Sequence, residues 1–147
     1  MSGIIVGTDG SSHSQEAVEW AVREAAMRQA PVTVVIVFQA AVGYWDGKPS
    51  YPEGDELARR ARAVAQEQAD KALGQLGATP PPAVEVRAIH GIPADELMKA
   101  ARGADMLIVA ARGSGGFARL LLGSVATQLS HHALCPLVII PAADVHH

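Results

Sequence analysis

The chain has 147 residues, of which 49% are hydrophobic and 18% charged, and its formal net charge is −3. This length suits one domain, and the composition is typical of soluble globular proteins. With 12 basic against 15 acidic residues and no basic block, the sequence lacks the charge pattern of a nucleic-acid-binding protein. Its apolar runs are much shorter than the roughly 20 residues that span a bilayer, so we expect no membrane partner.

Cysteine content and the start of the chain predict the cellular location. Cys135 is the single cysteine, so an intramolecular disulfide is excluded, and no charged-then-apolar leader precedes the first strand-like run. Both features predict a reducing, cytoplasmic environment. We expect one domain over residues 1–142 and a short tail over 143–147, whose final histidines fit a native end or a purification tag equally well.

In the first half of the chain, strand-like and helix-like segments alternate. A strand is expected from Ile4 to Thr8, then a helix from Ser11 or Ser12 to about Gln29, since Ser12 and Gln15 have the spacing of a capping box. A second strand follows. The next segment is rich in Gly, Pro and aromatic residues and is expected to be a loop, and Gly77 ends the helix after it. The second strand is expected at Val32 to Phe38, the loop at Gln39 to Glu53 and the helix after it at Asp55 to Leu76.

The second half continues the alternation. Strands are expected at Val84 to Ile89, Met106 to Ala111 and Leu137 to Ile140. A helix opens at Pro93 and ends near Gly103, and the last helix begins at Gly123 or Ser124 and ends before Pro136. Five strands alternating with helices predict an α/β fold, with a parallel sheet covered on both faces.

A glycine-rich segment follows the fourth predicted strand. Gly113, Gly115 and Gly116 allow successive N–H groups to converge on an anion, and the helix that starts at Gly123 or Ser124 adds the positive end of its dipole. Arg112 and Arg119 supply cations nearby. These features favour phosphate, although such a loop equally well forms only a tight turn. Neither a Walker A motif nor a complete dinucleotide fingerprint is present.

The chain resembles the universal stress protein family, in particular its ATP-binding branch. The resemblance rests on three stretches: Ile4 to Ser11, Gly91 to Ala94, and Gly113 to Ser124 followed by Cys135 to Ile139. It implies an open five-stranded sheet of order 3-2-1-4-5, four helices on its two faces, and an adenine nucleotide α-hydrolase-like fold. It also implies a homodimer. In the implied strand order the last strand lies at an edge of the sheet, and an apolar edge over Leu137, Val138, Ile139 and Ile140 favours pairing with a second copy.

The same resemblance implies the nucleotide-binding residues. The family motif is Gly, two residues, Gly, nine residues, Gly, then Ser or Thr, and Gly113, Gly123 and Ser124 match it. Ala110 replaces the first glycine, so we expect weaker binding rather than none. Asp9 is expected at the ribose or adenine end, although an Asp after a strand is often only a turn former. The full predicted set is Thr8, Asp9, Val37, Ala110, Arg112, Gly113, Gly115, Gly116, Gly123, Ser124 and Val125.

Three functions are consistent with the sequence. The favoured one is a dimeric stress-response module that binds ATP, with or without Mg²⁺, or else AMP or a cyclic nucleotide. A slow ATP hydrolase is the second, although no catalytic residue is predicted beyond Asp9 as the only nearby carboxylate. A dimeric interaction protein without nucleotide is the third, with Ala110 as its best support. No metal site is predicted, because the adjacent His131 and His132 do not face the same way on a helix.

Overall fold

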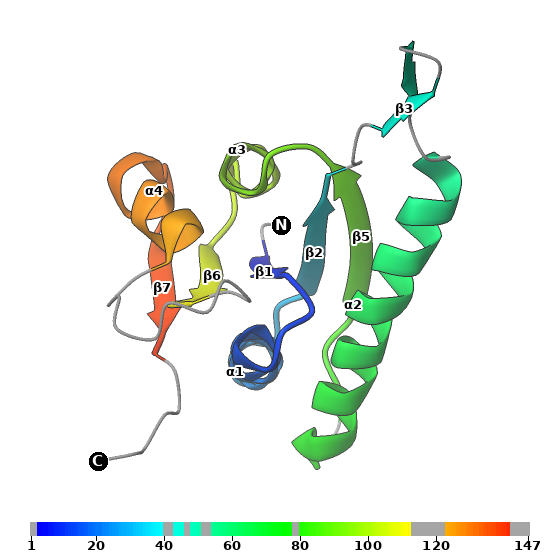
Figure 1. Ribbon diagram of the computed structural model, residues 1–147. Coiled ribbons are helices and arrows are strands. Elements are labelled where there is room, and N and C mark those ends of the chain that lie inside the picture. Colours follow the sequence, from blue (N-terminus) through cyan, green and yellow to red (C-terminus); the bar gives the residue numbers. More distant parts are fainter. Residues whose placement is uncertain are drawn as a thin grey trace, which may run out of the picture.

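The computed structural model describes residues 3–39, 43–45, 48–50, 54–77, 80–112 and 123–141. Its centre is an all-parallel five-stranded sheet with the order β5-β2-β1-β6-β7 (Figure 1). In chain order of these five strands the arrangement is 3-2-1-4-5, which confirms the predicted topology. The strands are β1 (Ile4–Thr8), β2 (Val32–Phe38), β5 (Val84–His90), β6 (Met106–Ala110) and β7 (Leu137–Ile140).

Helices cover both faces of the sheet, as predicted, with two on each face. Helices α1 (Ser12–Arg28) and α2 (Gly54–Leu76) pack on one face, and α3 (Pro93–Ala100) and α4 (Ser124–His132) pack on the other (Figure 1). Pro93 occupies the first turn of α3, and Asp95 and Glu96 favour that turn through the helix dipole. Among the described residues, no helix is both long enough and apolar enough to cross a membrane.

Two local predictions were wrong. The N-cap of α1 is Ser11 rather than Ser12: its side chain accepts a hydrogen bond from the Ser14 N–H, so the expected box between Ser12 and Gln15 does not form. The segment from Gln39 to Glu53, expected to be a loop, contains the antiparallel pair β3 (Gly43–Trp45) and β4 (Lys48–Ser50). A three-residue strand is too short for its alternation to stand out among glycines and prolines.

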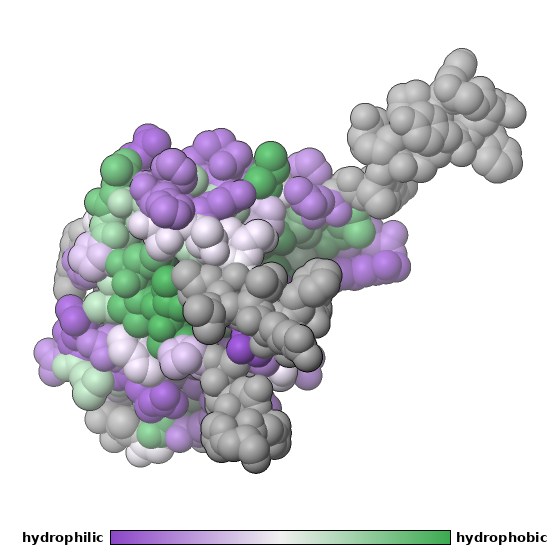
Figure 2. Space-filling model, turned by 60° about the vertical axis from the view of Figure 1, so that its left-hand side comes forward, coloured by the Kyte–Doolittle hydropathy of each residue, from purple (hydrophilic) through white to green (hydrophobic). Residues whose placement is uncertain are grey.

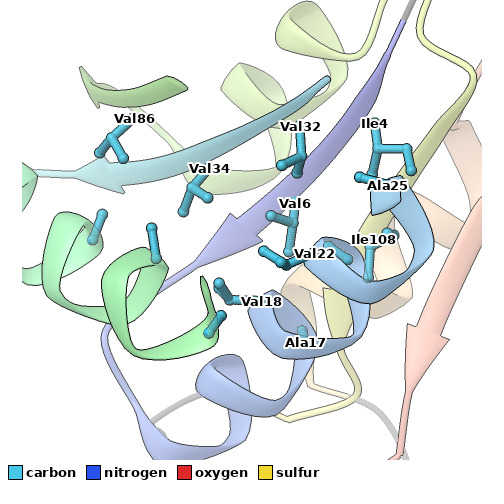
Figure 3. Close-up of a cluster of buried hydrophobic side chains, with 14 of the residues drawn as sticks. Ile4, Val6, Ala17, Val18, Val22, Ala25, Val32, Val34, Val86 and Ile108 are labelled. Carbon is cyan, nitrogen blue, oxygen red and sulfur yellow. The ribbon is translucent and has the colours of Figure 1, made fainter. Parts of the chain in front are cut away.

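Alternating strand residues build two separate cores. Ile4 and Val6 of β1 point toward α1 and α2, where Figure 3 shows them among Val18, Val22 and Val34. Ile5 points to the opposite face and packs in the cluster that includes Leu97 of α3 and Leu129 of α4. The side-chain period of two in a strand therefore decides which helix pair each residue of β1 meets. The same alternation decides which face of the sheet the side chains after Val6 meet.

The sheet reverses its direction of growth at β1. The strand pairs with β2 on one side and with β6 on the other, from Ile4 opposite Met106 to Val6 opposite Ile108. In open parallel sheets, ligands bind beyond the carboxyl ends of the strands that flank such a reversal. The ends of β1 and β6, at Thr8 and Ala110, are therefore the place to look for a site.

A side chain at Gly7 is expected to destabilise the protein. A Cβ atom built on it would lie 2.8 and 2.9 Å from the two terminal carbons of Leu97, which is only 4% exposed and has little room to move. We predict that Gly7→Ala lowers the free energy of unfolding by about 1–3 kcal/mol, because the overpacked side chains must shift. Urea unfolding measures this change.

Gly74→Ala in α2 is the matched control for Gly7→Ala. A Cβ atom at Gly74 meets no atom within 4 Å, so alanine should stabilise the helix by about 0.5–1 kcal/mol. Equal stability of the wild type and the Gly7→Ala variant would mean that α3 packs less tightly on β1 than the structure indicates.

Candidate functional site

Three described segments meet the carboxyl edge of the sheet around β1 and β6. The first is the turn from Thr8 to Ser11, which joins β1 to α1. The second is Ala111 and Arg112, just after β6, and the third is the start of α4 at Gly123. The sheet order makes β1 and β6 neighbours, so the residues predicted at their ends do come to the same edge.

Thr8 directs its side chain away from the α3 and α4 face. It continues the alternation of Ile4 and Val6, is 8% exposed, and lies in a buried polar cluster with Ser14 and Gln68. Its hydroxyl oxygen is 2.7 Å from the Ser14 hydroxyl oxygen, bonds the side-chain carbonyl of Gln68, and accepts the Gly10 N–H at 3.1 Å. The Thr8 hydroxyl therefore stabilises the turn. A ligand would meet the main-chain groups of Thr8 rather than its side chain.

Asp9 and Gly10 form a tight turn. Oδ1 of Asp9 accepts the Ser11 N–H at 2.9 Å, which is the turn-forming role considered from the sequence. Gly10 has φ = +84°, a left-handed conformation that favours glycine, and an added Cβ would lie 3.0 Å from Val64 Cγ1. Asp9 is nevertheless an exposed residue at this edge of the sheet.

A main-chain hydrogen bond holds the start of α4 next to the end of β6. The Gly123 N–H donates to the Ala111 carbonyl over 2.6 Å, and the Gly123 carbonyl accepts the Thr127 N–H as the first helical bond. Gly123 is the N-cap residue and provides no side-chain capping bond to the first turn. A capping side chain would satisfy one of the N–H groups that a helix leaves unpaired at its start, and an anion can take that role in its place.

The remaining predicted residues divide between the two faces. Val37 and Val125 pack against the core on the α3 and α4 side, whereas the methyl group of Ala110 packs against the core on the α1 and α2 side. Arg112 is half-buried and Ser124 is exposed. The predicted glycines Gly113, Gly115 and Gly116, together with Arg119, lie outside the described residues.

Sequence reasoning missed two members of the polar cluster, Ser14 and Gln68. They are only 3% and 7% exposed, and both lie within otherwise apolar stripes of their helices. Ser14 precedes the buried Ala17 and Val18 by three and four residues, while Gln68 lies three residues after the buried Ala65. A polar residue at helical spacing within an apolar stripe was the available signal.

Cys135 and the histidine pair show no features of a reactive or metal site. Burial raises the pKa of the Cys135 thiol, and a hydrogen bond from the main chain of Leu107 opposes this only partly, which favours the unreactive protonated form. The rings of His131 and His132 are 6.2 Å apart and tilted by 59°. Within the described part of the chain, no three metal-ligating side chains gather in one place.

Comparisons with known proteins all indicate the same family. The model of the universal stress protein family matches residues 1–141. A universal stress protein of Mycolicibacterium smegmatis is 36% identical over 143 residues, and one of Mycobacterium tuberculosis is 34% identical over 144 residues. These matches cover 97% of this chain but 49% and 48% of the relatives, so the chain spans about half of their length.

Solved structures show the same fold. The universal stress protein UspA from Lactobacillus plantarum superposes with a TM-score of 0.74 at 24% identity, over 95% of this chain and 97% of that one. A universal stress protein in complex with cAMP gives 0.68 at 24% identity, over 97% and 98%. The universal stress protein from Archaeoglobus fulgidus in complex with dAMP gives 0.66 at 20% identity, over 95% and 98%. The chain therefore belongs to the universal stress protein family.

Proposed function

We propose that this protein binds an adenine nucleotide, with ATP foremost, across the carboxyl ends of β1 and β6, and acts as a dimeric sensor or regulatory module in the stress response. The observation that best supports the site is the bond from the Gly123 N–H to the Ala111 carbonyl. It fixes the start of α4 beside the strand end where the sheet reverses. A phosphate placed there meets main-chain N–H donors that the helix already holds in position, so binding need not order them.

The charge at the start of α4 suits a phosphate group. The positive end of the helix dipole attracts an anion, as do the first-turn N–H groups, to which Gly123 provides no side-chain cap, and Arg112 follows the adjacent strand. The glycines from Gly113 to Gly116 would extend this donor set by their resemblance to the family motif. The described residues thus provide one side of a phosphate site, built largely from main-chain groups.

Two related proteins indicate the class of ligand. The solved complexes with cAMP and dAMP contain adenine, a sugar and one phosphate group, and both proteins share the fold of this chain. AMP and cyclic nucleotides are therefore alternative ligands within the same proposal. Ala110 carries its methyl group on the α1 and α2 side, packed against that core, which favours retained rather than abolished binding.

Binding is favoured over hydrolysis by the arrangement around Asp9. A general base must reach the attacking water, but Oδ1 of Asp9 already accepts the Ser11 N–H in the turn. This bond favours a structural or ligand-orienting role for the carboxylate. We therefore propose a nucleotide-binding module, whose occupancy rather than its turnover carries the signal.

The β7 edge supports the proposed dimer. Within the described residues, β7 pairs only with β6, and all four of its apolar side chains are partly exposed. Leu134, just before the strand, is 89% exposed. Figure 2 turns this side of the molecule forward and shows an apolar area there. An unpaired apolar edge without charged residues favours pairing with a second copy of the chain.

Released ligand provides the most direct test of nucleotide binding. Heat denaturation of the purified protein, followed by chromatography and mass spectrometry, is expected to release an adenine nucleotide. Calorimetry should then show binding of ATP, AMP or cAMP and little binding of GTP, measured with and without Mg²⁺. If no adenine nucleotide is released and none produces binding heat, the proposed function is wrong. Phosphate release that scales with protein concentration would instead support the hydrolase alternative.

A further inference from the structure

Gln68 is a buried polar residue in the middle of α2, far in sequence from the β1 end that it contacts. Only 7% of it is exposed, and it lies between α1 and α2 rather than on the solvent side of either helix. Burying an amide is unfavourable unless its donor and acceptor are both satisfied. In the described part of the protein, every buried side-chain nitrogen and oxygen has a partner, so the partners of Gln68 explain its position.

Both ends of the Gln68 amide bond the turn after β1. Nε2 donates to the Ser11 carbonyl at 3.1 Å, and Oε1 accepts the Thr8 hydroxyl. A carbonyl oxygen only accepts hydrogen bonds, so the nitrogen must face Ser11, and the side-chain oxygen is then left for Thr8. The amide therefore spans the turn and bonds its first and last residues.

The contact between the helices is reciprocal. The main-chain carbonyl of Gln68 accepts a hydrogen bond from Nε2 of Gln15 in α1 at 3.1 Å, and this nitrogen is also 3.0 Å from a carboxylate oxygen of Glu19. Helix α2 thus binds both the turn and the first turns of α1. A shift of α2 along its axis would break bonds at Thr8, Ser11 and Gln15 together, which couples the position of α2 to the shape of the turn.

The cluster is buried but borders a surface groove rather than the centre of the apolar core. A groove of about 580 Å³ runs between α1 and α2 beside it, and its lining includes Gly10, Ser11, Gln15, Val64 and Gln68. The core residues of α2, among them Ala65 and Ala69, point toward the sheet instead. A substitution at Gln68 therefore changes the turn while leaving the packing of the sheet in place.

On the basis of the proposed function, we propose that Gln68 is a positioning residue for the nucleotide site, which holds the turn from Thr8 to Ser11 in its binding shape and couples α2 to nucleotide occupancy. Gln68 itself need not contact the ligand. It acts through Thr8 and Ser11, whose turn carries Asp9 toward the expected nucleoside end. A nucleotide that orders this turn would thereby favour one position of α2.

Gln68→Leu and Gln68→Glu test the proposal by calorimetry with ATP and with adenosine. Leucine has a similar size but no hydrogen-bonding group, so we expect at least about 10-fold weaker binding of both ligands, because the affected turn meets the nucleoside rather than the phosphates. Gln75→Leu and Gln75→Glu, seven residues further along α2 at the same groove, are the matched controls and should bind like the wild type.

The pH profile of the Gln68→Glu variant separates positioning from a general loss of structure. At about pH 7.5 the introduced carboxylate places an acceptor against the Ser11 carbonyl, so binding should be weak. A protonated carboxyl group restores one donor and one acceptor, so affinity should recover toward the wild-type value as the pH falls to about 5. The wild-type profile corrects for the other ionisable groups near this cluster, which include Asp9, His13, Glu16, Glu19, Glu67 and Lys71.

The outcomes distinguish this proposal from the proposed function. If the wild type binds nucleotide and both Gln68 variants bind it equally well at every pH, the positioning role is wrong and the nucleotide site stands. If the wild type binds no nucleotide, both proposals fail. Should Gln68→Leu not fold by circular dichroism, recovery of binding by Gln68→Glu at low pH decides the question, and absence of recovery overturns the proposal.

Discussion

Replacing Gly123 with valine is expected to abolish measurable ATP binding while the protein remains folded. Gly123 has φ = −72° and ψ = 170°, an extended conformation that valine adopts readily, so the backbone itself permits the substitution. Its N–H bond to Ala111 and its carbonyl bond to Thr127 involve only main-chain atoms and persist in the variant. The effect comes from the isopropyl group, which occupies the space in front of the first-turn N–H groups where we place the phosphate.

The expected loss of ATP affinity is at least about 100-fold, which corresponds to roughly 2.7 kcal/mol of binding free energy. Calorimetry with ATP measures it, and adenosine should lose much less affinity because it has no phosphate. Thr127→Val, one turn further along α4 and exposed, introduces the same side chain without approaching the helix start and should bind ATP normally. A folded Gly123→Val protein that binds ATP like the wild type would show that the phosphate lies elsewhere.

The architecture was predictable from the sequence because its signals are local. Apolar β-branched runs such as Val32–Phe38 are buried on both faces of a parallel sheet and therefore stand out without knowledge of their neighbours. The start of α4 at Ser124 was predictable for a similar reason, since a glycine and a serine precede an amphipathic stretch. The sheet order, by contrast, came from the family resemblance, and the structure confirms it.

The details of the site depend on long-range contacts that no local pattern encodes. Thr8 was predicted to bind the ligand, but nothing in the sequence revealed that its hydroxyl would bond Gln68, which is 60 residues away. The side chain of Thr8 lies on the face of the sheet that α1 and α2 cover. The packing of these two helices depends on the whole topology rather than on the residues near Thr8. The N-cap of α1 shows a different limit, because Ser11 and Ser12 are both suitable capping residues and only the structure shows that the Ser11 side chain accepts the Ser14 N–H.

A proline at Ile139 is expected to convert the proposed dimer into a monomer. Pro136 and Ile140 accept hydrogen bonds from Leu107 of β6 and from Ala111 just after it. By the alternation of a parallel ladder, Leu137 and Ile139 therefore direct their main-chain groups away from the sheet. Ile139→Pro therefore removes an outward N–H donor without removing a bond to β6. If two β7 edges pair through these groups, the variant should run as a monomer in size-exclusion chromatography with light scattering.

Ile139→Thr is the matched control for the proline variant. Both substitutions remove apolar bulk from a partly buried position beside the second core, but only proline removes the N–H group. The threonine variant should therefore remain dimeric, with some loss of stability that thermal unfolding measures. A dimer that survives Ile139→Pro would mean that the copies associate through side chains or through another surface. A monomeric wild type would exclude the dimer altogether and leave the nucleotide site to act within one chain.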